Sequence, residues 1–246
     1  DAVPTGNDWL HEIKYDGYRA LIAASGQKVT LFTRNGLDWT EKFAPLTGAI
    51  AALDLPPCLI DGEVVALDGN GNPDFSTLQQ TLKRGHGQED ATRPLHLFAF
   101  DLLSLDGQDL KGLPTIERKE RLEALLHQAE SPIHVSDHVL GAGETLFRSL
   151  CEAGQEGIIS KRADAPYRSS RTRSWVKVKC TRRQEFVLVG WTRSNARGRP
   201  FASLLLAQHE GQKLVYKGKV GTGFDSQAMD ELDKAMARLA TDTAPV

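Results

Sequence analysis

The feature that most restricts the fold is a series of short apolar or alternating runs, each bounded by glycine, asparagine, aspartate or proline. Runs of this kind predict β-strands at residues 10–14, 19–25, 28–34, 58–67, 95–105, 133–138, 157–162 and 175–179. Helical periods interrupt them at residues 115–130, with Thr115 as the expected N-cap, and at residues 144–154, with Gly154 at the expected end. This irregular order predicts a mixed α+β domain rather than a regular βαβα alternation.

The pattern changes after Arg183. Strand-like runs with glycine-rich turns occupy residues 185–194, 201–210 and 213–224, and a helical period follows at residues 226–239. We expect a small β-barrel domain of OB type here. A chain of 246 residues with 40% hydrophobic content can bury one substantial core and a smaller one, so we expect domains at 1–181 and 182–246.

The cysteines and the absence of apolar segments bear on the compartment. Cys58, Cys151 and Cys180 lie far apart, with no C-x-x-C pair and no histidine at zinc spacing, which predicts neither a disulfide nor a zinc site. No run approaches the roughly 18 apolar residues of a membrane span, and the first residues do not resemble a secretory signal. We therefore expect a soluble protein of a reducing cytoplasm.

Charge is distributed unevenly along the chain. The formal net charge of −2 argues against binding of nucleic acid by bulk electrostatics. Residues 160–183, however, carry nine basic side chains and one acidic side chain. This basic strip is a candidate phosphate-binding surface, in which we expect nucleic acid contacts from Arg162, Arg168, Arg171, Arg173, Arg182 and Arg183.

Residues 14–19, Lys-Tyr-Asp-Gly-Tyr-Arg, fit the pattern K-x-D-G-x-R. A lysine at a strand end is ordinarily a solvated charge, and Asp-Gly is ordinarily a turn. The pattern nevertheless resembles the nucleophile motif of the covalent nucleotidyltransferases, which comprise ATP-dependent DNA ligases, RNA ligases and messenger-RNA capping enzymes. The resemblance implies that Lys14 is the catalytic nucleophile.

Later segments resemble further motifs of the same family and follow in the family's order. They are FTRNG, LIDGEVVALD, LFAFDLL, EGIISKR and WVKVK, at residues 32–36, 59–68, 97–103, 156–162 and 175–179. Each has a plain structural alternative when taken singly, such as a charge on a strand face or an edge-strand lysine. Together they imply an α+β nucleotidyltransferase domain, the ATP-grasp-like adenylation domain of DNA ligases, followed by the OB-fold β-barrel.

The resemblance also implies contacts with the base of the nucleotide. Phe98 and Phe100 share one strand face, so either could stack on a purine, and the family favours Phe100. Glu12, two residues before Lys14, resembles the carboxylate that accepts from the adenine amino group, which favours ATP over a guanine nucleotide. Ile13, beside the nucleophile, is expected in the same site.

Ribose, phosphate and metal contacts follow from the remaining motifs. Arg19 and Arg34 offer planar forks for ribose and phosphate. The family places Glu63 on the ribose hydroxyls. Carboxylate oxygens are ligands that Mg²⁺ prefers, and we assign Glu156 first and Glu63 second to a metal, with Mn²⁺ as an alternative ion.

A lysine attacks phosphorus only as the neutral amine, and a free lysine with a pKa of about 10.4 is almost fully protonated at pH 7. Lys177 and Lys179, two apart on one predicted strand, send their side chains to the same face. We therefore expect both lysines in the nucleotide and catalytic site, where they would lower the pKa of Lys14.

Wider similarity at residues 8–20, 31–40, 73–79, 98–107 and 217–224 resembles the ligase module of the bacterial end-joining ligase D. This resemblance implies ATP-dependent sealing of 5′-phosphate/3′-hydroxyl breaks through a lysyl-AMP intermediate. It further implies nicked or broken duplex DNA as partner, a Ku-like end-binding protein, polymerase and phosphoesterase modules, a nucleoid-associated cytoplasmic location and a monomeric state.

One departure from the family leaves alternatives open. Ligases of this group carry a last basic motif at the far end of the OB domain, and nothing after Phe224 resembles it. We therefore expect a truncated OB domain. A nick-binding module without turnover, an RNA ligase and a capping enzyme remain as alternative functions.

Overall fold

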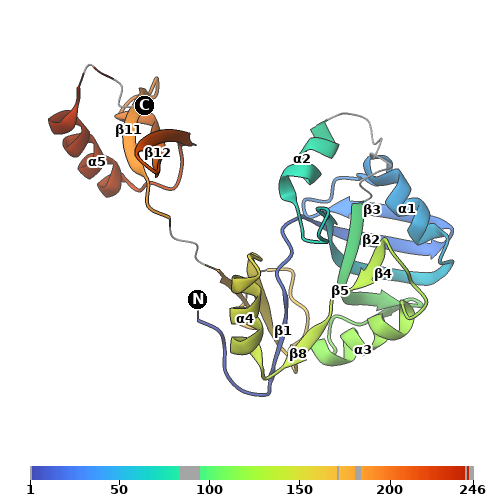
Figure 1. The fold of residues 1–246 in the computed structure, drawn as a ribbon. Helices are drawn as coiled ribbons and strands as arrows, with labels where there is room; N and C mark the ends of the chain where they lie inside the picture. Colours follow the sequence, from blue (N-terminus) through green and yellow to red (C-terminus); the bar gives the residue numbers. More distant parts are fainter. Residues whose placement is uncertain (1, 84–94, 171, 181–183, 242, 244–246) are drawn as a thin grey trace. The chain divides into compact units, whose positions relative to one another are not determined.

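The computed structural model of the chain describes residues 2–83, 95–170, 172–180, 184–241 and 243. It divides into two compact units, Asp1–Cys180 and Thr181–Val246. Figure 1 shows the ribbon of both units, each of which is described below by itself.

One sheet of the first unit has the strand order β3-β2-β4-β5-β6, and β7 runs parallel to β5. Its strands are β2 (Tyr18–Gly26), β3 (Lys28–Thr33), β4 (Leu55–Ala66), β5 (Leu95–Leu105), β6 (Gln108–Asp109) and β7 (Ile133–Val135). β4 is antiparallel to both β2 and β5, and Glu63 lies opposite Arg19 on one side and Phe98 on the other. This register brings three of the sequence motifs together in the middle of the sheet.

The main core lies between this sheet and the helices that connect its strands along the chain. The helices are η1 (Thr40–Phe43), α1 (Ala44–Ala51), α2 (Phe75–Lys83) and α3 (Thr115–Leu125). Leu46 and Ile50 of α1, Leu78 of α2 and Leu122 of α3 are buried with strand residues such as Ile60. Sequence reasoning predicted α3 but not α1 or α2, which are only 8 and 9 residues long.

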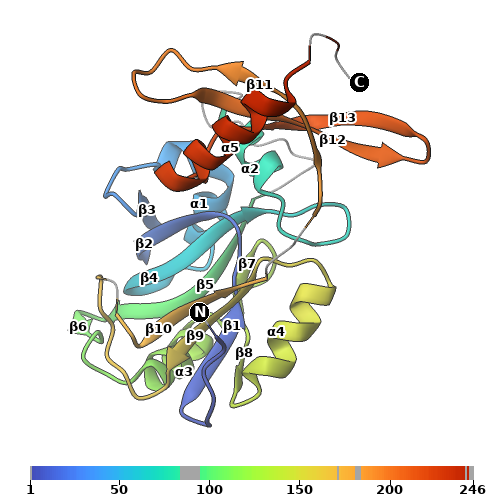
Figure 2. The ribbon, with the colours of Figure 1, turned by 90° about the vertical axis from the view of Figure 1, so that its left-hand side faces the viewer.

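A second sheet of the same unit has the order β10-β9-β1-β8, with all neighbours antiparallel. Its strands are β1 (Trp9–Ile13), β8 (His138–Leu140), β9 (Gly157–Arg162) and β10 (Trp175–Lys179), and α4 (Gly143–Glu152) packs beside them (Figure 2). Ile13 lies opposite Ile158, and Lys179 lies opposite Gly157. The nucleophile motif, which follows β1, therefore lies next to the EGIISKR and WVKVK motifs.

The second unit contains β11 (Val187–Arg193), β12 (Phe201–Glu210) and β13 (Lys213–Val220) in an antiparallel sheet, followed by α5 (Ser226–Leu239). Phe201, Leu204 and Met236 form its buried core. These elements confirm the predicted runs and are consistent with an OB-type domain. Among the described residues, no helix is both long and apolar enough to cross a membrane.

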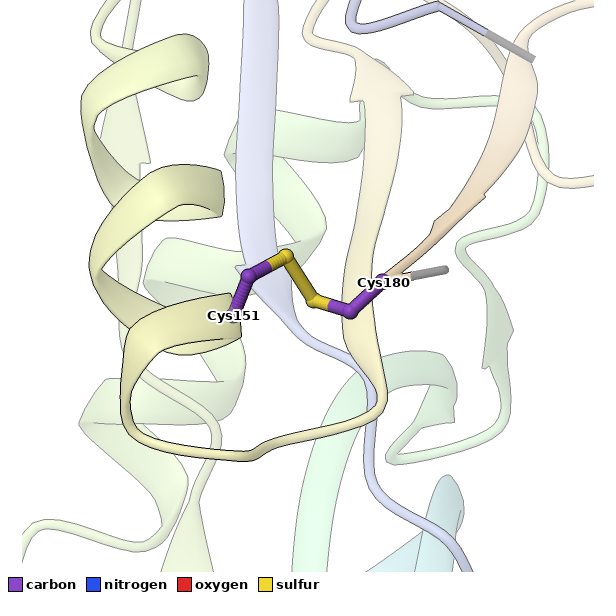
Figure 3. Close-up of a disulfide and its surroundings, with 2 residues drawn as sticks. All are labelled: Cys151 and Cys180. Carbon is purple, nitrogen blue, oxygen red and sulfur yellow. A yellow bond between two sulfur atoms is a disulfide. The ribbon is translucent and has the colours of Figure 1, made fainter. Parts of the chain in front are cut away.

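The prediction that the cysteines form no disulfide was wrong. Cys151, near the end of α4, is bonded to Cys180, which follows β10, and their Cα atoms lie 5.4 Å apart (Figure 3). The spacing of 29 residues could not reveal that these two ends meet in the fold. Cys58 is free and buried. Because disulfides are rare in a reducing cytosol, the cysteines no longer support that compartment.

The expected N-cap of α3 was also wrong. Thr115 is the first residue inside the helix, and Pro114 occupies the N-cap position without a side-chain cap. The Thr115 hydroxyl is buried and donates to the carbonyl oxygen of Ala165, at 3.0 Å. The hydroxyl that the sequence pattern assigned to helix capping is therefore bonded to Ala165, a residue distant in the sequence.

Candidate active site

Lys14 follows directly after β1 and is held by its backbone, because its N–H donates to the carbonyl oxygen of Gly157 at 3.0 Å. The Asp-Gly turn then packs tightly against β4. A Cβ atom on Gly17 would lie 2.3 Å from the carbonyl oxygen of Val64, so only glycine fits there. This close approach places Lys14 beside the strand that carries Glu63.

The residues around Lys14 enclose a cavity of about 100 Å³. Most of the expected nucleotide contacts line it: Glu12, Ile13, Lys14, Arg19, Glu63, Phe100 and Lys177. Its other walls, which sequence reasoning did not assign to the site, are Tyr15, Ile159, Lys161 and Trp175. Each of these lies within or beside a recognised motif, and that proximity was the only signal available in the sequence.

A larger cavity of about 760 Å³ adjoins the first and shares Arg19, Glu63, Trp175 and Lys177 with it. Its size lies within the range of ordinary ligand sites. The remaining expected nucleotide contact of this region, Arg34, is exposed and lines the larger cavity. The two cavities together provide a narrow inner part beside Lys14 and a wide, cationic outer part.

The two phenylalanines of β5 have different surroundings. Phe98 is stacked between Tyr15 and His134, with ring centroids 4.1 and 4.8 Å away. Phe100 instead lines the inner cavity, and the Lys161 Nζ lies 4.5 Å from its ring centroid. The geometry therefore leaves Phe100 as the ring that a base can stack on.

Glu12 is buried, and each of its carboxylate oxygens has a lysine partner. Oε1 accepts from Lys119 at 2.5 Å, and Oε2 lies 2.6 Å from the Lys161 Nζ. Burial raises the pKa of Glu12, but the two lysines outweigh it and lower the pKa below its usual value. Burial lowers the pKa of Lys161. Glu12 thus stays ionised inside the protein, although sequence reasoning had left it without partners.

Arg19 does not present its guanidinium freely. Its Nε and one terminal nitrogen bind both oxygens of the buried Asp61, at 2.9 and 2.5 Å, and the same terminal nitrogen donates to the Tyr167 hydroxyl at 3.0 Å. The fork that we expected to hold phosphate or ribose is therefore occupied by Asp61. Arg19 still forms part of both cavity walls.

Lys14 and Lys179 share one carboxylate. The Lys14 Nζ contacts Glu156 Oε2, and the Lys179 Nζ lies 2.8 Å from Oε1. Burial raises the pKa of Glu156, but the hydrogen bonds from both lysines lower it overall. The hydrogen bond with Glu156 in turn raises the pKa of Lys179. The expected site residues Lys14, Glu156 and Lys179 are thus brought together as one ionic group.

Lys177 lies apart from this group and faces the cavities. Burial is the main cause that lowers its pKa, and the neighbouring cations Lys14, Arg19 and Arg34 add to the effect. Lys177 and Lys179 share a strand face as expected, but they have different partners. Lys177 is the member of the pair that is available to a ligand in the cavity.

The carboxylates fit a metal ion unequally. Glu63 is largely buried, burial raises its pKa to about 7, and no described cation lies within ion-pair distance of it. A buried carboxylate of this kind suits a cation or ligand hydroxyl groups. Both oxygens of Glu156, the residue that we had assigned first, are taken by lysines. Within the described residues no cluster of three or more histidines, cysteines or acids could hold a metal alone.

The basic strip is not uniformly available for a polyanion. Arg162 is ion-paired with Asp8 at 2.5 Å and with Asp164 at 2.8 Å, whereas Arg168 and Arg173 are exposed. Arg168 also lines the larger cavity. The other expected nucleic acid contacts, Arg171, Arg182 and Arg183, lie outside the described residues.

Comparison with known families decides what kind of site this is. The ATP dependent DNA ligase domain family matches residues 3–179, and the ATP dependent DNA ligase C terminal region family matches residues 197–246. The chain belongs to the ATP-dependent DNA ligase family. The ionic group around Lys14 and the adjoining cavities therefore form the candidate active site of a DNA ligase.

Relatives of this ligase chain include bacterial end-joining proteins. It is 38% identical over 247 residues to the multifunctional non-homologous end joining protein LigD of Pseudomonas aeruginosa, covering 99% of this chain and 29% of that protein. It is 36% identical over 242 residues to the corresponding protein of Mycobacterium tuberculosis strain H37Rv, covering 97% of this chain and 30% of that protein. The chain thus spans less than a third of the length of these relatives.

Solved structures agree with the family assignment. A mycobacterial DNA ligase D complexed with ATP and MES is 34% identical, with a TM-score of 0.62, and the match covers 98% of this chain and 75% of that chain. The ligase domain of M. tuberculosis LigD gives a TM-score of 0.61 at the same identity. The fold of the first unit is therefore that of the ATP-dependent DNA ligases.

Proposed function

We propose that this chain is the ligase part of a bacterial end-joining system and that it seals 5′-phosphate/3′-hydroxyl breaks in duplex DNA through a lysyl-AMP on Lys14. The observation that carries the proposal is the position of Lys14 in a cavity that also contains an aromatic ring, two carboxylates and Lys177. In this arrangement a nucleotide base can stack on Phe100 while its phosphates reach the lysines.

The first step requires the Lys14–Glu156 pair to open, because a protonated lysine has no lone pair. After one proton of the Lys14 ammonium has passed to water, the Lys14 nitrogen attacks the α-phosphorus of ATP, a P–N bond forms, and the bond to the departing pyrophosphate breaks. A second proton passes from the nitrogen to water as the phosphoramidate forms. Lys177, which faces both cavities, is placed to stabilise the negative charge on the phosphate during this transfer. When Lys14 leaves Glu156, the other carboxylate oxygen of Glu156 keeps its contact with Lys179.

The following steps move AMP to DNA and release it. The 5′-phosphate oxygen of the break attacks the phosphorus of lysyl-AMP, and the P–N bond breaks. The 3′-hydroxyl then attacks the 5′-phosphate, a phosphodiester forms, and AMP leaves. We place these phosphates in the larger cavity, where Arg34, Arg168 and Lys177 supply positive charge.

Mg²⁺ is part of the proposal. Glu63 would hold it together with the substrate phosphates, and Glu156 could join once Lys14 has left its carboxylate. The bound ion would neutralise phosphate charge. We propose that Glu63 first accepts hydrogen bonds from the ribose hydroxyls when the nucleotide binds. Its contact with the metal follows in a later step.

The relatives' names support the wider role. Because they are called non-homologous end joining proteins, we propose broken or nicked duplex DNA as the partner, with a Ku-like end-binding protein and polymerase and phosphoesterase modules acting beside it. Such a substrate would place the protein in the bacterial cytoplasm, on nucleoid DNA. We further propose that this ligase part works as a monomer.

Incubation with ATP labelled at the α-phosphate, with Mg²⁺, tests the proposal. We expect covalent label on the unaltered protein and on Lys28→Ala, an exposed-lysine control, and none on Lys14→Ala. Absence of label on the unaltered protein would contradict self-adenylation. A second assay offers a pre-adenylated nick, and failure to join it would favour a module that binds breaks without sealing them.

A further inference from the structure

Lys119 is a buried lysine that does not line either cavity. It lies on α3, its side chain is 1% exposed, and its Nζ donates both to Glu12 and to the carbonyl oxygen of Ser136. Burying an ammonium group is costly unless it is paired and hydrogen-bonded. The contact with Glu12 spans 107 residues of sequence and links a helix of the main core to the wall of the nucleotide cavity.

The bonds of Lys119 fix where the Glu12 carboxylate points. Each Glu12 oxygen accepts from one lysine, so the carboxylate retains acceptor capacity for a donor in the cavity. Lys161 approaches from the cavity side, beside the rings of Phe100 and Trp175. Lys119, which does not line either cavity, approaches from the core side and joins Glu12 to α3.

Hydrogen bonds also connect Lys119 to the strand that carries Phe100. Ser136, whose carbonyl oxygen accepts from Lys119, donates its own N–H to the carbonyl oxygen of Ala99 at 2.7 Å. Ala99 precedes Phe100 on β5. Lys119 therefore fixes Glu12 relative to the ring on which the base is expected to stack.

We propose that Lys119 is a positioning residue for base selection, which holds the Glu12 carboxylate, ionised and correctly directed, for the exocyclic amino group of adenine. This inference rests on the proposed nucleotide site and extends it to a residue outside the cavity. Removal of Lys119 would leave Glu12 with Lys161 as its remaining partner and free to rotate toward it. As a consequence, the protein would discriminate less well between ATP and a nucleotide that lacks the 6-amino group, while binding of the phosphates would be kept.

The test compares two ligands that differ in one group. Dissociation constants are measured by calorimetry, without divalent metal, for ATP and for purine riboside triphosphate, the analogue that lacks the 6-amino group. The ratio of the two constants isolates the contribution of the amino group and needs no turnover. The variants are Lys119→Gln, Lys119→Met, Lys119→Arg and Glu12→Gln, and Arg121→Met removes an exposed charge from the same helix as a control.

We expect the preference for ATP to fall about tenfold in Lys119→Gln, Lys119→Met and Glu12→Gln, the weight of one hydrogen bond to a charged group. Lys119→Arg and Arg121→Met should keep it. Lys119→Gln retains a donor for Ser136, so it remains informative if the methionine variant does not fold. Thermal unfolding of every variant shows which of them can be compared.

Two results would overturn the inference in different ways. If Glu12→Gln lowers the ratio and folded Lys119→Gln does not, Lys119 only stabilises the fold. If neither variant lowers the ratio, Glu12 does not meet the amino group, and this part of the proposed nucleotide site fails as well. The labelling of Lys14 is measured separately, so loss of ligase chemistry cannot be mistaken for either result.

Discussion

Lys14 and Glu156 form an ion pair through Nζ and Oε2, although 142 residues separate them in the sequence. The strand register explains the contact, because β9 begins directly after Glu156 and pairs with β1, which ends directly before Lys14. The same carboxylate holds Lys179. The expected nucleophile is therefore stored in contact with an acid, and release from that acid must precede attack.

The first prediction concerns this acid. Glu156→Gln removes the carboxylate that we propose joins Mg²⁺ once Lys14 has left it, and we therefore expect the rate of self-adenylation to fall about tenfold or more. Stability should change by no more than about 1 kcal/mol, because the site is partly exposed. Glu152→Gln, in an exposed position at the end of α4, is the matched control. An unchanged rate in Glu156→Gln would remove Glu156 from the mechanism.

The second prediction follows from the pKa of Glu63, which burial raises from its usual 4.5 to about 7. The folded protein therefore binds a proton that the unfolded chain has lost between these pH values, so this group destabilises the fold increasingly as pH rises through that window. Glu63→Gln should remove the penalty. We expect the variant's stability relative to the unaltered protein to rise by at most about 3 kcal/mol between pH 4.5 and 7.

Urea unfolding curves at several pH values measure this difference. Glu41→Gln, an exposed acid on η1, serves as the control and should follow the unaltered protein at every pH. A difference between Glu63→Gln and the unaltered protein that stays constant from pH 4.5 to 7 would show that Glu63 titrates normally in the fold.

The third prediction concerns the Cys151–Cys180 disulfide. The cross-link closes a loop over a sequence separation of 29, and the chain-entropy model assigns such a loop about 3 to 4 kcal/mol. We expect the double variant Cys151→Ser/Cys180→Ser, and the unaltered protein in dithiothreitol, to lose a similar free energy of unfolding. Thiol counting in denaturant should give one free thiol before reduction and three after it. Three thiols before reduction would contradict the disulfide.

The fourth prediction separates the arginines of the basic strip. Binding of nicked DNA should depend on salt, and each arginine that contacts a phosphate should add about one to the slope of log K against log salt. Arg168→Ala and Arg173→Ala should each lower the slope by about one. Arg162→Ala should change it less, because Asp8 and Asp164 already balance its charge. Equal effects of the three substitutions would show that these ion pairs open when DNA binds.

Local patterns in the sequence predicted much of the architecture. The runs at 95–105, 157–162 and 175–179 coincide with β5, β9 and β10, and residues 226–239 coincide with α5. Strands and helices have hydrophobic periods of about 2 and 3.6 residues, and each period can be recognised from consecutive residues without knowing which distant segments pack against them. The resemblance in the motifs likewise led to the ligase family, since the motif residues lie in the short segments that fold together.

Partners could not be predicted in the same way. The helical period of α3 places Leu122 inside but gives no sign that Arg118 and Lys119 are buried with it, paired to Asp101 and Glu12. The free fork expected of Arg19 is likewise bound to Asp61. A charged residue on a helix or strand is normally solvated, and only a partner from elsewhere in the chain makes its burial tolerable.

The sequence by itself determined most of the strands, the family and the nucleophile motif, because each depends on residues close together along the chain. The run at 133–138 was an exception, since it divides into β7 and β8 of different sheets. Only the tertiary structure decided that Arg19 binds Asp61, that Cys151 meets Cys180, and that Glu12 lies between two lysines. These outcomes depend on strand register and on long-range contacts. They are set by packing between distant segments, which no local pattern records.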